Sequence, residues 1–157
     1  MGLDEIIAAY RLARHPEGGW FREVHRSSRP LAQIPGYPGV RPAFTAIYFL
    51  LARGDFSAFH RLRSEEAWIH LAGEPLELIL MGPEVRRVNL GPATEGGSPV
   101  AVVPAGELQA ARTLGEYTLS ACFVAPGFDF ADFSMPSREE LLREYPDRRE
   151  LILAFTR

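Results

Sequence analysis

Short apolar runs, each bounded by glycine or proline, cover most of the chain. Between Trp20 and Phe133 the runs have the length of strands and comprise residues 20–26, 44–51, 58–62, 66–72, 76–82, 85–90, 100–103, 108–111, 118–124 and 128–133. The segments between them are rich in glycine and proline, as in PGYPGVRP at 35–42 and GPATEGGSP at 91–99, which favours turns. Many short strands separated by such turns predict an all-β sandwich or barrel.

Both ends of the chain have a different pattern. Near the N-terminus apolar residues recur at helical spacing, at Leu3, Ile6, Ile7 and Tyr10. We therefore expect a helix over 3–12, capped by Asp4. In SREELLREYP, Ser137 and Glu140 have the spacing of a capping box and predict a second helix. Residues 151–155 are expected to add a last strand.

Length and composition indicate one globular domain spanning residues 1–157. Apolar residues make up 46% of the chain and charged residues 24%, which is usual for a globular protein. The net charge of −3 does not attract the phosphate backbone of nucleic acid, so no nucleic-acid partner is expected. The single cysteine, Cys122, cannot form an internal disulfide, and we expect it to be a small buried apolar side chain.

No membrane partner is expected either. The longest apolar run, residues 46–52, is too short to span a bilayer. The first residues carry Asp4 and Glu5 rather than the basic and apolar regions of a signal peptide. The sequence therefore predicts a cytoplasmic protein.

The stretch FHRLRSEEAWIHLAGEPL, residues 59–76, holds the most concentrated chemistry. We expect residues 58–62 and 66–70 to pair as a hairpin through a three-residue loop. Because side chains alternate along strands, this register places one set on a single face: His60, Leu62, Glu66, Trp68 and His70. If that face lines the interior, its polar groups are costly to bury unless the space holds water or a polar ligand.

Two kinds of chemistry fit this face. His60 beside Glu66 is a candidate catalytic pair for proton transfer, since a carboxylate fixes the tautomer of an imidazole and raises its basicity. In a binding site, Trp68 would instead stack on a flat or sugar-like ligand. The ligand's polar groups would then meet His60, Glu66, His70, Gln109 and Arg22.

Two motifs in this chain resemble those of the cupins. The residues Gly54, His60, Glu66 and Gly73 follow G-x5-H-x-H-x(3–4)-E-x6-G, with Leu62 in place of the second histidine. Downstream, VPAGELQAART resembles P-x-G-x2-H-x3-N, with Gln109 in place of the histidine. Together with HPEGGWFRE at 15–23 and CFVAPGFDFADF at 122–133, they are similar to a cupin branch of unknown function. That branch is related in fold to dTDP-sugar 3,5-epimerases and germin-type proteins.

The resemblance implies a fold and a set of partners. The fold is a double-stranded β-helix, or jelly-roll barrel, with short N- and C-terminal helices, usually paired as a homodimer around a small-molecule ligand. Sugar epimerases of this fold use a histidine base and a phenolic acid on the opposite face of the sugar. Tyr48 and Tyr117 are the candidates for that acid, and Tyr48 is also a candidate ligand-binding residue.

A metal site is the competing interpretation. Glu66 and His70 lie about 13 Å apart along a strand, so they cannot share one ion. The best ligand set is therefore His60, Glu66 and Gln109, which has less histidine or thiolate than zinc, iron or copper sites normally use. We expect no cofactor to be required, with a divalent metal bound only at low occupancy.

The sequence thus predicts a small-molecule-binding cupin and a metal-independent isomerase or epimerase acting on a sugar-like substrate. A metal-dependent cupin enzyme and a non-catalytic binding or sensing protein are the alternatives. The remaining histidines, His15 and His25, are expected at the surface or in turns. Within GGWFRE, alternation requires either Arg22 or Glu23 to face inward.

Overall fold

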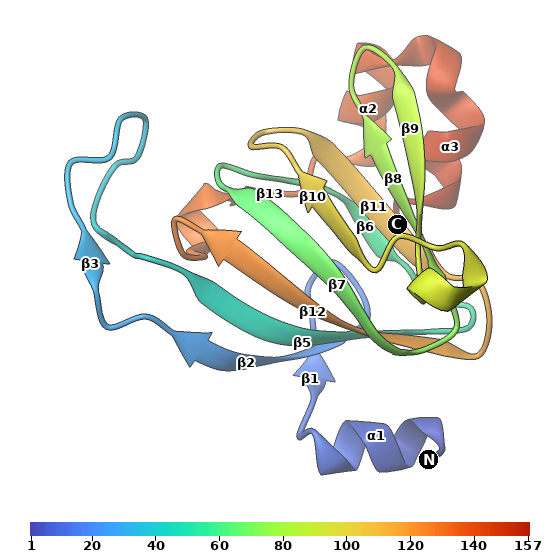
Figure 1. The fold of residues 1–157 in the computed structure, drawn as a ribbon. Helices are drawn as coiled ribbons and strands as arrows, with labels where there is room; N and C mark the ends of the chain where they lie inside the picture. Colours follow the sequence, from blue (N-terminus) through green and yellow to red (C-terminus); the bar gives the residue numbers. More distant parts are fainter.

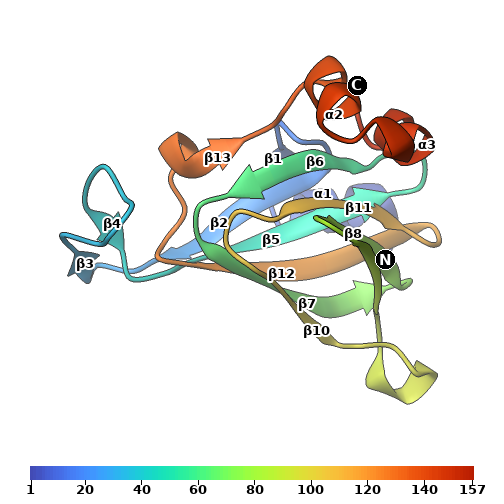
Figure 2. The same cartoon turned by 90° about the horizontal axis from the view of Figure 1, so that it is seen from above.

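Two antiparallel sheets face each other in the computed structural model, which describes residues 1–157 (Figure 1). The six-stranded sheet runs, in spatial order, β1 (Ala13–Arg14), β2 (Trp20–Arg26), β5 (Thr45–Ala52), β12 (Tyr117–Ala125), β7 (Glu65–Gly73) and β10 (Val100–Val103). The five-stranded sheet runs β13 (Phe133–Ser134), β6 (Ser57–Leu62), β11 (Leu108–Thr113), β8 (Leu76–Met81) and β9 (Val85–Leu90). A ribbon of β3 (Pro30–Leu31) and β4 (Arg41–Pro42) extends from one end (Figure 2).

From β5 to β13 the chain passes repeatedly between the two sheets, which is the connectivity of a jelly roll. The predicted all-β jelly-roll fold is therefore confirmed. The strand predicted over 128–133 is largely replaced by the 3₁₀ turn η2 (Phe130–Asp132), and only its last residue belongs to β13. A second short 3₁₀ turn, η1 (Ala93–Glu95), precedes β10.

Short helices cover the outside of the sheets (Figure 1). The N-terminal helix α1 (Leu3–Ala9) is shorter than predicted, and its cap is Gly2, whose N–H donates to the Glu5 carboxylate at 2.8 Å. The prediction that Asp4 caps this helix is therefore wrong. The capping box of α2 (Arg138–Glu144) is confirmed, because Ser137 and Glu140 each bond the other's backbone N–H.

The C-terminal segment is helical, which corrects the strand predicted over 151–155. After η3 (Pro146–Arg148), α3 (Arg149–Ala154) places Ile152 and Phe155 on one side. Both side chains are buried in a cluster with Phe59 and Leu108 of the five-stranded sheet. Apolar spacing of three residues suits the face of a helix that packs on a sheet. No helix of this protein combines the length and the apolar character that crossing a membrane requires.

The predicted hairpin of residues 58–62 and 66–70 does not form. Strand β6 pairs with β11 and β13, whereas β7 pairs with β12 and β10, so the two lie in opposite sheets. The corner between them is held by other segments, since Arg63 N–H donates to the Asp132 carbonyl at 3.0 Å. A short polar loop fits a hairpin and a crossing between sheets equally well, and the sequence does not distinguish them.

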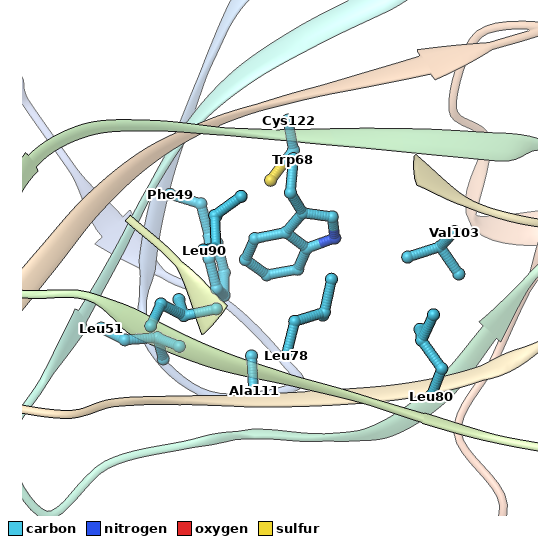
Figure 3. Close-up of a cluster of buried hydrophobic side chains, with 10 residues drawn as sticks. Phe49, Leu51, Trp68, Leu78, Leu80, Leu90, Val103, Ala111 and Cys122 are labelled. Carbon is cyan, nitrogen blue, oxygen red and sulfur yellow. The ribbon is translucent and has the colours of Figure 1, made fainter. Parts of the chain in front are cut away.

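The space between the sheets is partly filled by a compact apolar cluster around Trp68 (Figure 3). The Trp68 indole packs edge-to-face against Phe49, with ring centroids 5.4 Å apart. The surrounding side chains come from both sheets and include Leu51, Leu78, Leu80, Leu90, Val103, Ala111 and Cys122. This cluster holds the sheets apart and leaves an unfilled volume beside it.

Candidate functional site

A cavity of about 360 Å³ lies between the two sheets, next to the Trp68 cluster. This volume is within the range of small-molecule sites. Its polar and ionisable lining consists of His15, Glu17, Glu23, Arg26, Thr45, His60, Glu66, Cys122 and Asp129. Aromatic side chains form much of the rest, namely Phe21, Phe49, Trp68, Phe128, Phe130 and Phe133. Phe128 and Phe130 precede β13 and Phe133 begins it, so this part of the chain covers one side of the cavity.

His60 is buried in the wall formed by β6, and its orientation is fixed on both sides of the ring. Its Nδ1 lies 2.8 Å from the carbonyl oxygen of Ala58. Because a carbonyl only accepts, Nδ1 carries the hydrogen and Nε2 is the basic atom. The ring stacks on Phe133, with centroids 5.5 Å apart. Nε2 lies 3.3 Å from Oε2 of Glu17, a residue that sequence reasoning did not single out.

Glu17 is the direct carboxyl partner of His60. Its other oxygen, Oε1, accepts the Ser57 hydroxyl at 2.8 Å. Burial raises the pKa of Glu17 to about 8, against the opposing effects of the Ser57 hydrogen bond and Arg157. Burial also lowers the pKa of His60, although Glu66 acts in the opposite direction. At neutral pH the proton between Glu17 and His60 therefore rests mainly on the carboxyl.

The turn HPEGG carries Glu17 into the interior because its glycines allow a very close approach. A Cβ on Gly18 would lie 2.0 Å from the Phe56 carbonyl oxygen, and one on Gly19 would lie 2.7 Å from that of Leu50. Both glycines have positive φ, +110° and +75°, which other residues rarely adopt. Paired glycines that bring a turn against a strand were the signal that could have indicated an inward Glu17.

Glu66 lies on the opposite wall, in β7, and is held by a relay of two hydrogen bonds. The Trp68 Nε1–H donates to Oε1 of Gln109 at 2.9 Å, and Gln109 Nε2 donates to Oε2 of Glu66 at 2.7 Å. The indole only donates, so the amide oxygen must face Trp68 and the amide nitrogen must face Glu66. Burial raises the pKa of Glu66 to about 7, although His60 opposes the shift.

The structure therefore brings His60 and Glu66 to one cavity, from opposite sheets rather than from one hairpin. Gln109, a predicted ligand-binding residue, does not line the cavity; it lies in β11 beside His60 and reaches across the interior to Trp68 and Glu66 of β7. Trp68 is both a core residue and part of the cavity wall. All four side chains are buried.

His15 lies in a turn, as predicted, since its carbonyl accepts the Gly18 N–H at 3.0 Å, but its side chain is not at the surface. Its side chain is only 7% exposed and lines the cavity instead of the surface. The ring packs edge-to-face against Phe21, with centroids 4.6 Å apart, and its Nδ1 accepts the backbone N–H of Glu17 at 3.2 Å. Burial, with a contribution from His60, lowers the pKa of His15 to about 4. His15 is therefore neutral near pH 7, with its hydrogen on Nε2.

Arg22 and Tyr48 do not reach the cavity, which corrects their prediction as ligand-binding residues. Phe21 and Glu23 line the cavity, so alternation turns Arg22 to the outer face of the sheet. There the Arg22 guanidinium lies 5.5 Å from the centre of the Tyr48 ring. Tyr48 in turn packs edge-to-face on Tyr10, with centroids 5.1 Å apart, in a cluster that includes α1.

His70 is also outside the cavity. It lies further along β7 than Trp68, and its Nε2 is 3.2 Å from the Gly73 carbonyl oxygen and 3.3 Å from that of Glu74. These contacts give it a local structural role and contradict the predicted ligand contact. His25 is exposed, as predicted, and packs on Phe44, with ring centroids 4.9 Å apart.

The metal-ligand set predicted from the sequence does not assemble. The Gln109 oxygen already accepts the Trp68 N–H and its nitrogen faces Glu66, so Gln109 offers no free donor atom to an ion. No group of three or more His, Cys, Asp or Glu side chains has an arrangement suited to a metal ion. Burial raises the pKa of the Cys122 thiol well above its usual range, which disfavours the thiolate that a metal requires.

Comparisons with known proteins agree with this fold. The family model described as Cupin superfamily (DUF985) matches residues 4–136. A hypothetical protein from Leishmania major is 31% identical, with a TM-score of 0.91 over 99% of both chains. A Shewanella oneidensis protein is 34% identical, with a TM-score of 0.89 over 100% of this chain and 98% of that one.

A more distant likeness shows the fold alone. A cupin 2 conserved barrel domain protein from Rhodopseudomonas palustris has 18% identity and a TM-score of 0.54, over 93% of this chain and 98% of that one. No curated protein matches the sequence. The family model covers most of the chain, and two full-length structural relatives exceed 30% identity. The chain belongs to the DUF985 family of the cupin superfamily.

Proposed function

We propose that this cupin is a metal-independent isomerase or epimerase that moves a proton on a small, sugar-like molecule. One observation carries the proposal: proton-exchanging groups stand on opposite walls of one cavity, His60 with Glu17 on one side and Glu66 on the other. An epimerisation removes a proton from one face of a carbon and returns one to the opposite face. That reaction needs two such groups.

The protonation states support this reaction near neutral pH. The pKa of Glu66 is raised to about 7 and that of Glu17 to about 8. Between these values the predominant state has Glu66 ionised and one proton on the Glu17–His60 pair. Glu66 is then the base and the Glu17–His60 pair is the acid. In general, where the protein environment separates the pKa values of two groups, the group with the lower pKa is the base and the one with the higher pKa is the acid.

The chemical step follows from that state. The Glu66 carboxylate takes the proton from a carbon next to a substrate carbonyl, and the electrons of the broken C–H bond move to the carbonyl oxygen as an enolate. The proton of the pair, once on Nε2 of His60, adds to the opposite face of the same carbon. In the reverse direction His60 is the base, and the imidazolium that forms is stabilised by the Glu17 carboxylate 3.3 Å away.

The first alternative, a metal-dependent enzyme, has no observation in its favour, because the predicted ligands do not assemble. The second, non-catalytic binding, shares the cavity and predicts the same ligand contacts without turnover. Because groups that can exchange a proton lie on both walls of the cavity, we favour catalysis over non-catalytic binding.

Proton exchange in D₂O tests the proposal. Small ring ketones and ketoses are incubated with the protein, and deuterium incorporation at carbon is followed by NMR. We expect exchange that is lost in His60→Asn and in Glu66→Gln, while the affinity for these neutral ketones and ketoses stays within about threefold of the original. Metal loss on His60→Asn would support the metal-dependent alternative. Weaker binding with no exchange at any pH would support the non-catalytic one.

A further inference from the structure

Carboxyl groups outnumber cationic groups around the cavity. Its ionisable lining includes Glu17, Glu23, Glu66 and Asp129, against one guanidinium. That guanidinium, of Arg26, is already paired with a carboxylate: it donates to both oxygens of Glu23, at 2.9 and 2.7 Å, and to the Phe128 carbonyl oxygen at 3.1 Å. A negatively charged ligand would therefore find no free cation in this site.

Glu66 adds an independent indication of what the cavity takes. The residue is only 6% exposed and lines the cavity. Its Oε2 accepts the Gln109 amide at 2.7 Å, and no arginine side chain forms an ion pair with this carboxyl. A buried carboxylate is costly unless a positive charge pairs with it, and a ligand that brings a positive charge lowers that cost.

The aromatic rings of the lining point to the same chemistry. Rings from five separate elements surround the cavity, namely Phe21, Phe49, Trp68, Phe130 and Phe133 of β2, β5, β7, η2 and β13. The negative face of an aromatic ring attracts a cation, and the attraction grows when the cation is removed from water. Carboxyls and aromatic faces together form the usual environment for an ammonium group.

We infer that the cavity selects a small ring bearing an ammonium group, with the cation between the Glu66 carboxyl and the aromatic rings. This inference rests on the proposed function and narrows its substrate class to amino-substituted, sugar-like rings. It also predicts that phosphorylated or carboxylated rings are rejected, because the lining holds no unpaired positive charge to receive them.

Three probes that share one ring and differ in charge test this selectivity: cyclohexylammonium, cyclohexanol and cyclohexanecarboxylate. Isothermal titration calorimetry with the full chain at pH 8 is expected to give cyclohexylammonium the highest affinity, by about tenfold over cyclohexanol, with no measurable binding of the carboxylate. Equal affinities for cation and alcohol, or tighter binding of the carboxylate, would overturn the inference.

Substitutions on one strand locate the effect. Glu66→Gln should weaken cyclohexylammonium binding by about tenfold and leave cyclohexanol unchanged, whereas Glu65→Gln, an exposed neighbour in β7, should change neither. An unchanged cation affinity in Glu66→Gln would refute the assignment to Glu66. The order of the three probes is measured on the unmodified protein and does not depend on the variants folding.

These probes carry no carbonyl and therefore undergo no proton exchange. Their binding reports the selectivity of the cavity even if the proposed reaction is wrong. Conversely, exchange on neutral ketones without any preference for the ammonium probe would keep the proposed function and reject this inference.

Discussion

Replacing Glu17 with glutamine distinguishes the effect of this buried carboxyl on stability from its proposed role in proton transfer. Glutamine has the shape of the protonated acid, so its oxygen can accept the Ser57 hydroxyl and its N–H can donate to His60 Nε2. What it lacks is the ability to ionise. The variant is therefore a permanent copy of the neutral state that Glu17 prefers when folded.

The magnitude follows from the shift of the Glu17 pKa, from 4.5 to about 8, a difference of 3.5 units. A pKa that is higher in the folded state means that the folded protein binds this proton more tightly than the unfolded chain does. The stabilisation that this proton provides is complete below pH 4.5 and is lost as the pH rises to about 8. At 1.36 kcal/mol per unit, the full loss is about 5 kcal/mol.

Glu17→Gln does not suffer that loss. We expect the free energy of unfolding of the variant to equal that of the unmodified protein near pH 4.5 and to exceed it by about 3 kcal/mol at pH 7. Urea unfolding at several pH values between 5 and 8 measures the difference. Glu150→Gln, at an exposed position of α3, is the matched control and should show no such trend.

A difference between Glu17→Gln and the unmodified protein that stays constant across this pH range would refute the reasoning. It would mean that folding does not raise the pKa of Glu17, so that Glu17 is ionised in the folded protein throughout this pH range. The same variant should lose deuterium exchange, because glutamine cannot give up the shared proton. Higher stability with lost activity is the combination that identifies a functional buried acid.

Four further predictions concern other parts of the molecule. Gln109→Leu should lower the free energy of unfolding by about 2–4 kcal/mol in urea titrations, because it leaves both the Trp68 N–H and the Glu66 carboxyl without a partner; an effect below about 1 kcal/mol would contradict the relay. The rate of deuterium exchange should be bell-shaped in pH, falling below about 7 as Glu66 gains a proton and above about 8 as the Glu17–His60 pair loses one; a monotonic profile would disagree. Elemental analysis should find substoichiometric metal, and one tightly held transition ion per chain would overturn this expectation. The homodimer implied by the cupin resemblance stays a prediction. Val102 and Phe123 are exposed on the six-stranded sheet, so a Val102→Glu, Phe123→Glu double variant should sediment as a monomer. If the unmodified protein is itself a monomer, the prediction is wrong.

The fold was predictable because its signals are local. Strand-length apolar runs and glycine-rich turns indicate an all-β sandwich or barrel without knowledge of which strand pairs with which, and the cupin resemblance implies the jelly roll. The pairing of the strands depends on contacts that are distant in sequence. In the loop after β6, the Arg63 N–H donates to the Asp132 carbonyl, and the chain crosses to the other sheet instead of forming the expected hairpin. His60 and Glu66 still meet because a side chain that faces inward from either sheet of a sandwich reaches the same interior.

The candidate site was predictable only as far as the cupin motifs extend. The first motif supplies His60 and Glu66, but the second supplies Gln109, which holds Trp68 and Glu66 through hydrogen bonds from the facing sheet and does not line the cavity. The remaining chemistry comes from His15 and Glu17, which lie in a turn outside both motifs. A search for replaced metal ligands within the motifs therefore could not find them.

That turn also supports the proposed proton chemistry over metal chemistry in this cavity. Leu62 and Gln109 remove two donor atoms that the motifs would otherwise provide, while Glu17 places a carboxyl 3.3 Å from His60 Nε2, the atom that a metal would need. An ion at Nε2 would have to displace the proton of Glu17. That proton is tightly held, because burial raises the pKa of Glu17 to about 8. The same proton is what the proposed reaction transfers, so the feature that disfavours a metal is the one that makes His60 and Glu66 an acid–base pair.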